Sequence, residues 1–239
     1  MSEWAAKRFW KTAEVIAKAD GFTVQLDGRP VRTPAKAPLV VPSQQMAAAI
    51  AAEWDAQDEK INPLSMPVTR AANATVDKVV PQFDDVAALL ASYGETDLLC
   101  YRAVAPETLA LRQSEAWDPL LEWAADRFGA RLHAMPGVMY QPQPQESIDR
   151  LAAEVRRHDP FELTALNEVV TLSGSLIIGL AVTERHLEAE DLWNRSLVDE
   201  IYQREVWGAD EEADATRALK QNDFLQARRF LDLHRPSAI

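Results

Sequence analysis

The chain has 239 residues, of which 47% are hydrophobic and 26% charged, so it can form one large or two smaller globular domains. Its net charge of −12 and its pI near 4.8 argue against binding to nucleic acid or to an anionic membrane surface, because both need a basic footprint. The single cysteine excludes an intramolecular disulfide and a multi-cysteine metal site, and it favours a reducing compartment.

The N-terminal sequence MSEWAAKRFWKTAEV has neither the apolar core of a secretory signal nor the Arg/Ser-rich composition of an organelle transit peptide. The most apolar run, Val169–Val182, is interrupted by polar and glycine residues and is too short to cross a bilayer. We therefore expect a cytoplasmic protein of bacterial type, with this run as a buried helix.

Residues 8–41 predict β-strands. Phe22, Val24 and Leu26 alternate with polar neighbours and are followed by Asp27-Gly28. This pattern predicts a hairpin, because both central residues of a type I′ turn need positive φ. Pro30 cannot donate to a sheet, so the second arm should be short or on an edge.

The first expected helix begins after Ser43, a typical N-cap residue. Met46, Ile50 and Trp54 then recur every four residues and predict one buried stripe. Trp54 is expected to have a structural role. A proline-rich connection follows, and we expect a helix up to Lys78.

The remaining chain predicts a succession of helices with a short strand around Val138–Gln141. The first of these helices ends at Gly94, which we expect to be its C-terminal capping residue. Another runs from Ala105-Pro106 to Gly129, and Pro119 inside it either kinks this helix or restarts it with Asp118 as the cap. The later helices are expected over Glu146–His158, Phe161–Arg185, Glu188–Trp207 and Asp210–His234.

The distribution of charge changes near residue 80, where the predicted strand-rich part of the chain gives way to the predicted helices. Residues 1–80 carry 10 Lys/Arg and 9 Asp/Glu, whereas residues 81–239 carry 15 and 28. We expect an α+β protein in which residues 1–80 form a small strand-rich domain and residues 81–239 a larger all-helical domain. The acidic second domain would suit a basic or hydrogen-bond-donating partner, or its charge serves solubility alone.

Few features indicate an enzyme. The sequence has no glycine-rich phosphate loop, no G-x-S-x-G, no H-E-x-x-H and no C-x-x-C. The stretch SYGETDLLCYRA (Ser92–Ala103) does hold Glu95, Asp97 and Cys100, which are reactive residue types. Because Leu98 and Leu99 precede the cysteine, we interpret Cys100 as a buried small side chain and the acids as helix caps.

The stretch Leu192–Gly208, LWNRSLVDEIYQREVWG, is the strongest candidate for a binding surface. On one continuous helix, Glu200 would share a stripe with Trp193, Leu197 and Trp207. A carboxylate on an aromatic stripe must be paired or presented to a partner. Arg204 at i+4 could pair with it inside the chain. Alternatively, Trp193, Asp199, Glu200, Arg204 and Trp207 together form a surface that receives a partner protein.

Taken in order, several segments resemble one family, the assembly chaperones of the F-type ATP synthase that act on the alpha subunit of its catalytic head. The matching segments are RFWK, LDGRPVRTPAKAPLVVP, EWDAQDEKINPLSMPVT, SYGETDLLCYRA, PETLALRQSEAWDPLLEWAADRFGA, SGSL, LWNRSLVDEIYQREVWG and FLQARRFL. The match is to the bacterial form. The resemblance implies a two-domain protein that is not an enzyme, needs no cofactor or metal and masks the beta-facing surface of the unassembled alpha subunit. It also implies a role for Glu200.

Two hypotheses follow. The first is a monomeric chaperone that binds the alpha subunit through the surface around Glu200. The second is a small-molecule enzyme or sensor whose site lies at a joint between the domains, around Glu95, Asp97 and Cys100. A solvent-open pocket at these residues would favour the second hypothesis, and burial of Leu99 and Cys100 would oppose it.

Overall fold

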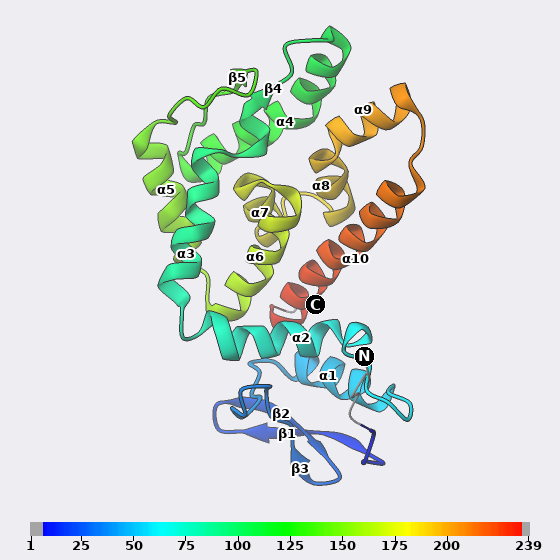
Figure 1. The fold of residues 1–239 in the computed structure, drawn as a ribbon. Helices are drawn as coiled ribbons and strands as arrows, with labels where there is room; N and C mark the ends of the chain where they lie inside the picture. Colours follow the sequence, from blue (N-terminus) through cyan, green and yellow to red (C-terminus); the bar gives the residue numbers. More distant parts are fainter. Residues whose placement is uncertain (1–6, 236–239) are drawn as a thin grey trace. The chain divides into compact units, whose positions relative to one another are not determined.

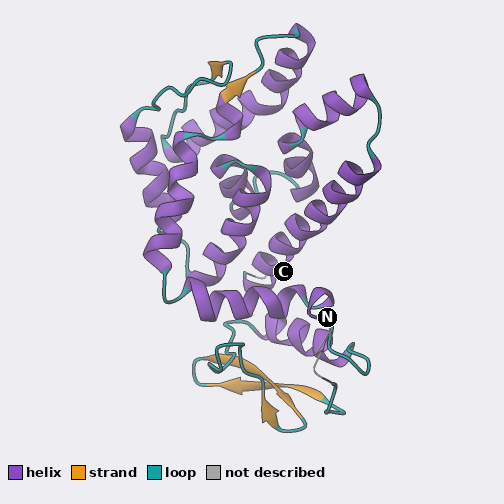
Figure 2. Cartoon of the chain, in the orientation of Figure 1, coloured by secondary structure: helices purple, strands orange, loops and turns teal. Residues whose placement is uncertain are grey.

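The computed structural model describes residues 7–235, so the first six residues of the N-terminal sequence lie outside the described part. Two compact units are present (Figure 1). The first takes the chain up to Gln82 and again from Arg229, and the second is Phe83–Arg228. The expected α+β class is confirmed, with an antiparallel sheet near the N-terminus and mostly helices after it (Figure 2).

The first unit joins a small sheet to short helices. Its elements are β1 (Ala13–Lys18), β2 (Gly21–Leu26), β3 (Arg29–Pro30), α1 (Gln44–Asp55), the 3-10 turn η1 (Pro63–Ser65), α2 (Pro67–Ala74) and the π-helical turn η2 (Thr75–Val79). The strands are antiparallel in the order β1-β2-β3. The predicted turn is confirmed, because Asp27 and Gly28 both have positive φ, 47° and 80°. β3 is only two residues long, as Pro30 led us to expect.

Helix α1 begins where the sequence predicted. The Ser43 hydroxyl accepts a hydrogen bond from the Met46 N–H at 3.0 Å and caps the helix. Met46 and Ile50 are buried, whereas Trp54 is partly exposed. Trp54 packs edge-to-face against the buried Trp10, with ring centroids 5.1 Å apart. A structural role for Trp54 stays a prediction.

The second unit is helical except for one short strand pair. Its elements are α3 (Phe83–Ser92), the 3-10 turns η3 (Tyr93–Glu95) and η4 (Leu98–Cys100), β4 (Tyr101–Arg102), α4 (Glu107–Phe128), β5 (Met135–Pro136), α5 (Gln145–Val155), α6 (Pro160–Ser173), α7 (Leu176–Thr183), α8 (Ala189–Ser196), α9 (Val198–Trp207) and most of α10 (Glu211–His234). Strands β4 and β5 pair in parallel. This pair corrects the all-helical expectation, and it lies before the strand expected around Val138–Gln141.

Two long helices expected from the sequence are each divided. Gly174 adopts a left-handed conformation, φ 71°, and ends α6, after which Ser175 caps α7 by accepting from the Ile178 N–H. Leu197 leaves helical geometry between α8 and α9. The expected end at Gly129 is confirmed, since Gly129 is left-handed, whereas the restart considered at Pro119 is absent because α4 is one helix through this residue.

Helices α6 and α7 contribute many of the buried residues in the core of the second unit. Every residue of α7 is buried, which agrees with the expectation of a buried helix from the apolar run. No helix of the described chain combines the length and the apolar character that crossing a membrane requires.

Candidate functional site: a pocket between α9 and α10

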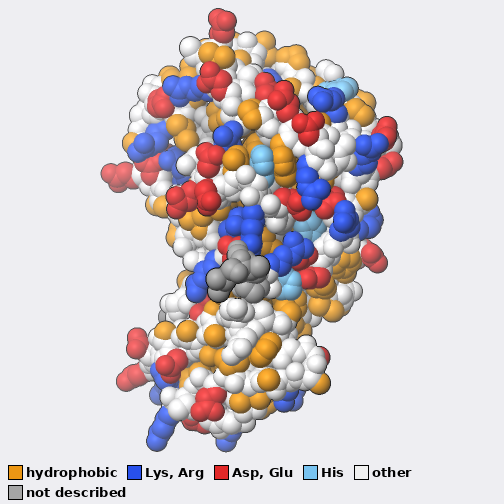
Figure 3. Space-filling view, turned by 180° about the vertical axis from the view of Figure 1, so that it is seen from behind, with side chains coloured by type: hydrophobic (Ala, Val, Ile, Leu, Met, Phe, Trp, Pro, Cys, Tyr) orange, Lys and Arg blue, Asp and Glu red, His pale blue; other side chains and the backbone are white. Residues whose placement is uncertain are grey.

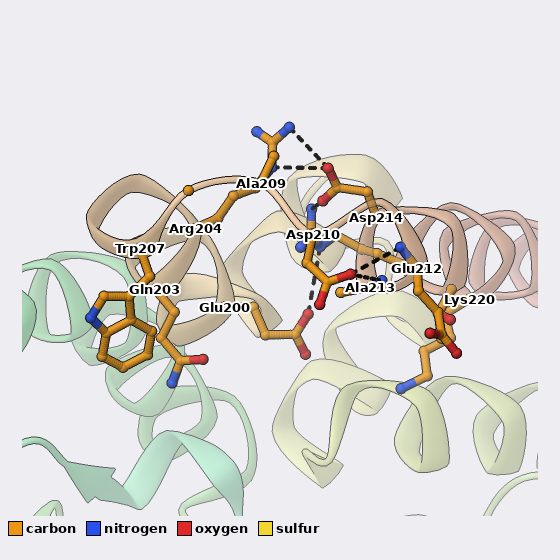
Figure 4. A pocket seen from close by; sticks show the side chains of 13 residues that line it. Glu200, Gln203, Arg204, Trp207, Ala209, Asp210, Glu212, Ala213, Asp214 and Lys220 are labelled. Atoms are coloured by element: carbon orange, nitrogen blue, oxygen red, sulfur yellow. Dashed lines mark hydrogen bonds and ion pairs between the residues drawn. The ribbon is translucent and has the colours of Figure 1, made fainter.

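Helix α9 and the first turns of α10 enclose a pocket of about 710 Å³ (Figure 4). It is lined by Glu200, Gln203, Arg204, Trp207, Gly208, Ala209, Asp210, Glu212, Ala213, Asp214, Thr216, Arg217 and Lys220. Three of the residues that the sequence singled out, Glu200, Arg204 and Trp207, are among them. All the lining residues belong to the second unit.

The connection between the two helices is specified locally. Gly208 has φ 94°, which few other residues adopt, and it ends α9. The Asp210 carboxylate then accepts hydrogen bonds from the N–H groups of Glu212 and Ala213, at 3.0 and 3.2 Å, and so caps α10. Gly208 and Asp210 therefore determine how the chain passes from α9 to α10 along the pocket.

Charges along the pocket form an alternating chain. Arg204 and Arg217 both contact Asp214, at 3.1 and 2.9 Å, and Arg217 also lies 3.5 Å from Glu200. Hydrogen bonding by Arg204 is the main cause that lowers the pKa of Asp214 below its usual value. Asp214 is thus ionised and links the two arginines.

Glu200 is the least constrained member of this chain. Its side chain is 55% exposed, and the Nε atom of Arg217 facing it is buried without a hydrogen-bond partner among the described residues. The distance of 3.5 Å therefore marks an ion pair without a hydrogen bond. The expected intramolecular partner was Arg204, but Arg204 binds Asp214 of α10 instead.

Trp207 lies at one end of the pocket and Lys220 at the other, with Glu200 between them (Figure 4). Trp207 is 78% exposed and its neighbour Val206 is 56% exposed. No residue of α9 is buried. An exposed tryptophan beside a weakly paired carboxylate is a typical composition of a protein-binding surface.

Trp193 corrects the expected aromatic stripe. Only 1% of it is exposed, and it packs on Phe224 of α10 with ring centroids 5.3 Å apart. The chain departs from helical geometry at Leu197, so Trp193 on α8 turns into the core while Glu200 on α9 faces the pocket. Trp193 therefore belongs to the core and not to the exposed surface.

Asp199 also has an internal contact. It accepts a hydrogen bond of 2.6 Å from the Gln113 amide, whose oxygen accepts from the Ala103 N–H at 2.7 Å. Gln113 is buried and joins α9 to the end of the SYGETDLLCYRA stretch. Sequence reasoning missed Gln113, since a polar residue in a long helix gives no sign of its partners.

Sequence reasoning also missed Asp214 and Arg217. Their i, i+3 spacing on α10 was the available signal. Their link to Glu200 depends on how α9 and α10 come together, and the sequence alone does not give that.

Most of the reactive side chains in SYGETDLLCYRA are inaccessible, although Glu95 is exposed. Asp97, Leu99 and Cys100 are fully buried, and the whole stretch belongs to the second unit. Desolvation by burial raises the pKa of Cys100 to about 12, so it is a poor nucleophile. This burial opposes the enzyme or sensor hypothesis.

Gly94 differs from its expected role as a capping residue. It lies in the 3-10 turn η3 and lacks positive φ. A Cβ atom there would stand 3.3 Å from Leu151 Cδ1. Gly94 therefore allows η3 to approach α5 closely.

The segment around Trp54 contains two residues whose importance the sequence did not reveal. Both carboxylate oxygens of Glu53 accept hydrogen bonds from the start of α2, from the N–H groups of Val68 and Thr69, each at 2.8 Å. The Gln57 amide donates to Ser65 and accepts from the Asn62 N–H. Glu53 and Gln57 thus hold the proline-rich connection against α1.

The net negative charge is dispersed on the face drawn in Figure 3. Acidic and basic side chains are interspersed there, without an extended area of one sign. On this face the charge favours solubility over the recognition of one highly basic partner.

Comparisons with known proteins agree on one family. The family model described as ATP12 chaperone protein matches residues 7–125. The mitochondrial protein atp12 of Schizosaccharomyces pombe is 26% identical over 224 residues, covering 87% of this chain and 75% of that protein.

Solved structures are similar over almost the whole chain. Atp12 from Paracoccus denitrificans has 48% sequence identity and a TM-score of 0.94, covering 98% of this chain and all of that one. The Atu1473 protein of Agrobacterium tumefaciens has 42% identity and a TM-score of 0.90, covering 95% of this chain and 85% of that one.

Proposed function

Because the chain belongs to the ATP12 family of ATP synthase assembly chaperones, we propose that it binds the unassembled alpha subunit and covers the surface that later meets the beta subunit. It acts as a cytoplasmic monomer and catalyses no reaction. An unassembled subunit interface is apolar and prone to aggregate, so a chaperone that masks it keeps the subunit soluble.

The observation that carries this proposal is the exposed Trp207 beside Glu200 in the α9–α10 pocket. Trp207 is 78% exposed and offers a large apolar ring, and Glu200 offers a carboxylate that Arg217 holds only weakly. Aromatic side chains with one well-placed charge contribute most of the affinity in many protein interfaces. We propose that a donor of the alpha subunit binds Glu200 while an apolar side chain packs on Trp207.

Co-expression with the alpha subunit tests the function. The amount of soluble alpha subunit and its co-elution with the chain in size-exclusion chromatography are measured. The wild type should increase the soluble fraction and form a complex. If it does neither, the proposed function is wrong.

Variants of the pocket test the site. Trp207→Ser and Glu200→Gln should each weaken binding of the alpha subunit about tenfold or more, the loss expected for an interface hot spot. Leu89→Ser on α3 is the matched control, since Leu89 is 58% exposed and lies outside the pocket. If both pocket variants bind like the control while the wild type binds the alpha subunit, the site is assigned wrongly.

A further inference from the structure

A second exposed apolar feature lies in the loop between α4 and α5. The Gln143 side chain closes this loop, because its oxygen accepts from the His133 N–H at 2.8 Å and its amide donates to the His133 carbonyl at 3.0 Å. Gln143 is only 8% exposed. Residues 133–143 therefore form a closed loop with a fixed base.

The base is anchored in the second unit. Leu132 and Met135 are each 5% exposed, and Met135 belongs to β5, which pairs with β4. The Gly137 N–H donates to the Arg102 carbonyl at 2.8 Å, and Gly137 has the left-handed φ of 79°. The loop is thus held in one conformation at its base, which limits the entropy lost on binding.

The end of the loop carries three consecutive apolar side chains that are largely exposed. Val138, Met139 and Tyr140 are 88%, 76% and 57% exposed. Val104 is 76% exposed and lies close to Gly137, the residue that precedes Val138. A Cβ atom built on Gly137 would be 3.7 Å from Cγ2 of Val104. We call Val104, Val138, Met139 and Tyr140 the apolar tip. Several adjacent exposed apolar side chains mark an interaction surface.

The surroundings of the apolar tip restrict its partner. Residues 129–145 contain no Asp or Glu, although the chain has 37 of them, so docking of this loop desolvates no carboxylate of its own. Pro136 in β5 cannot donate a hydrogen bond, which blocks the addition of a further strand along this edge. The partner must therefore be recognised by side chains, and it must present an apolar depression.

We propose that the apolar tip is a second docking element, which inserts into an apolar depression on the interface of the unassembled alpha subunit. This inference rests on the proposed function and adds a contact separate from the α9–α10 pocket. Helix α4 connects the two elements: its Asp118 pairs with Arg102 of β4, and its Arg112 pairs with Glu205 of α9. In Figure 1, β5 and α9 accordingly lie on either side of α4.

The double substitution Val138→Ser with Met139→Ser tests the apolar tip. Both side chains are exposed, so the thermal midpoint should stay at the wild-type value. The dissociation constant for purified alpha subunit should rise tenfold or more, whereas Leu89→Ser should stay within twofold of the wild type. Wild-type affinity in the double variant would overturn the inference and leave the proposed function standing. Failure of the wild type to bind alpha subunit would overturn both.

A labelling experiment gives a second readout that does not depend on a loss of affinity. Cys100 is fully buried, so Val138→Cys introduces one reactive thiol for an environment-sensitive dye. The dye emission should shift to the blue when alpha subunit is added, and no shift would contradict docking at the apolar tip. Sedimentation of the unliganded chain tests the alternative occupant. If the double substitution abolishes self-association, a second copy covers the tip and the inference is wrong.

Discussion

Asp97 is the buried side chain whose replacement tests the packing of the second unit most directly. Its carboxylate accepts hydrogen bonds from the N–H groups of Leu99 and Ile177, each at 3.0 Å. Leu99 lies in η4 and Ile177 in the first turn of α7, so one side chain ties together segments 80 residues apart. We choose the near-isosteric change Asp97→Asn.

In this variant an amide nitrogen replaces one carboxylate oxygen, and an N–H donor then faces the N–H of either Leu99 or Ile177. Leaving one buried donor unpaired costs about 1–3 kcal/mol. The free energy of unfolding in urea, followed by tryptophan fluorescence, should fall by this amount. Glu95→Gln is the matched control, because Glu95 is exposed and its replacement should change stability by less than about 0.5 kcal/mol.

The same carboxyl group should give the stability a pH dependence of known sign. Desolvation by burial raises the pKa of Asp97 from 3.8 to about 6. Between these values the folded protein keeps a proton that the unfolded chain has released. The stabilisation is therefore complete at low pH and is lost as the pH rises through the folded-state pKa. This stabilisation totals about 3 kcal/mol, of which less than about 1 kcal/mol is lost between pH 5.5 and 7.5.

Asp97→Asn lacks this contribution, so the difference in stability between wild type and variant should narrow as the pH rises from about 5.5 to 7.5. Urea unfolding at several pH values measures it. A difference that stays constant or widens over this range would refute the assigned pKa shift, and an unchanged stability at every pH would refute the hydrogen-bonding role.

Three further predictions concern other buried positions. Glu53→Gln should lower the free energy of unfolding by about 1–3 kcal/mol, because only one oxygen remains to accept the two N–H groups at the start of α2; unchanged urea unfolding would contradict this cap. Gly179→Ala should cost about 1–3 kcal/mol, since the new Cβ would stand 2.4 Å from Val170 Cγ2; a thermal midpoint equal to that of the wild type would disprove the clash. Cys100 should not react with a thiol reagent in the folded protein, because it is fully buried and burial raises its pKa to about 12; one thiol should appear in urea, and labelling without urea would show that the segment opens.

The sequence predicted those features whose cause is local. Asp27-Gly28 forms the expected turn and Ser43 caps α1, because each depends on a few neighbouring residues. Gly129 ends α4 for the same reason. The α+β class also followed from local periodicity, since alternating and helical patterns occupy different parts of the chain.

The division of the expected Phe161–Arg185 helix depends on distant residues. The N–H of Ile177 at the start of α7 is bound by Asp97, which lies 80 residues earlier. Gly174 was a visible signal, because glycine often follows the end of a helix. Periodicity alone could not show that a buried carboxylate would cap the next helix.

The candidate site was only partly predictable. A single helical period across Leu197 places Trp193 and Glu200 on one face, but the real helix divides there and the two residues separate. The nearest opposite charge in sequence, Arg204, is also not the partner of Glu200. Tertiary packing of α9 against α10 decides which charges meet.

The ion pair between Glu200 and Arg217 affects how a loss of alpha-subunit binding in a Glu200 variant is interpreted. Glu200→Lys would place a cation beside Arg217 and disturb the α9–α10 pocket itself, so weaker binding would have two explanations. Glu200→Gln and Arg217→Gln, made singly and together, separate them. An exposed pair of this kind stabilises the fold by only about 0.2–1 kcal/mol, so all three variants should remain folded. If Glu200→Gln weakens alpha-subunit binding equally with and without Arg217, Glu200 contacts the client directly; if the effect disappears in Arg217→Gln, Glu200 acts only by positioning Arg217.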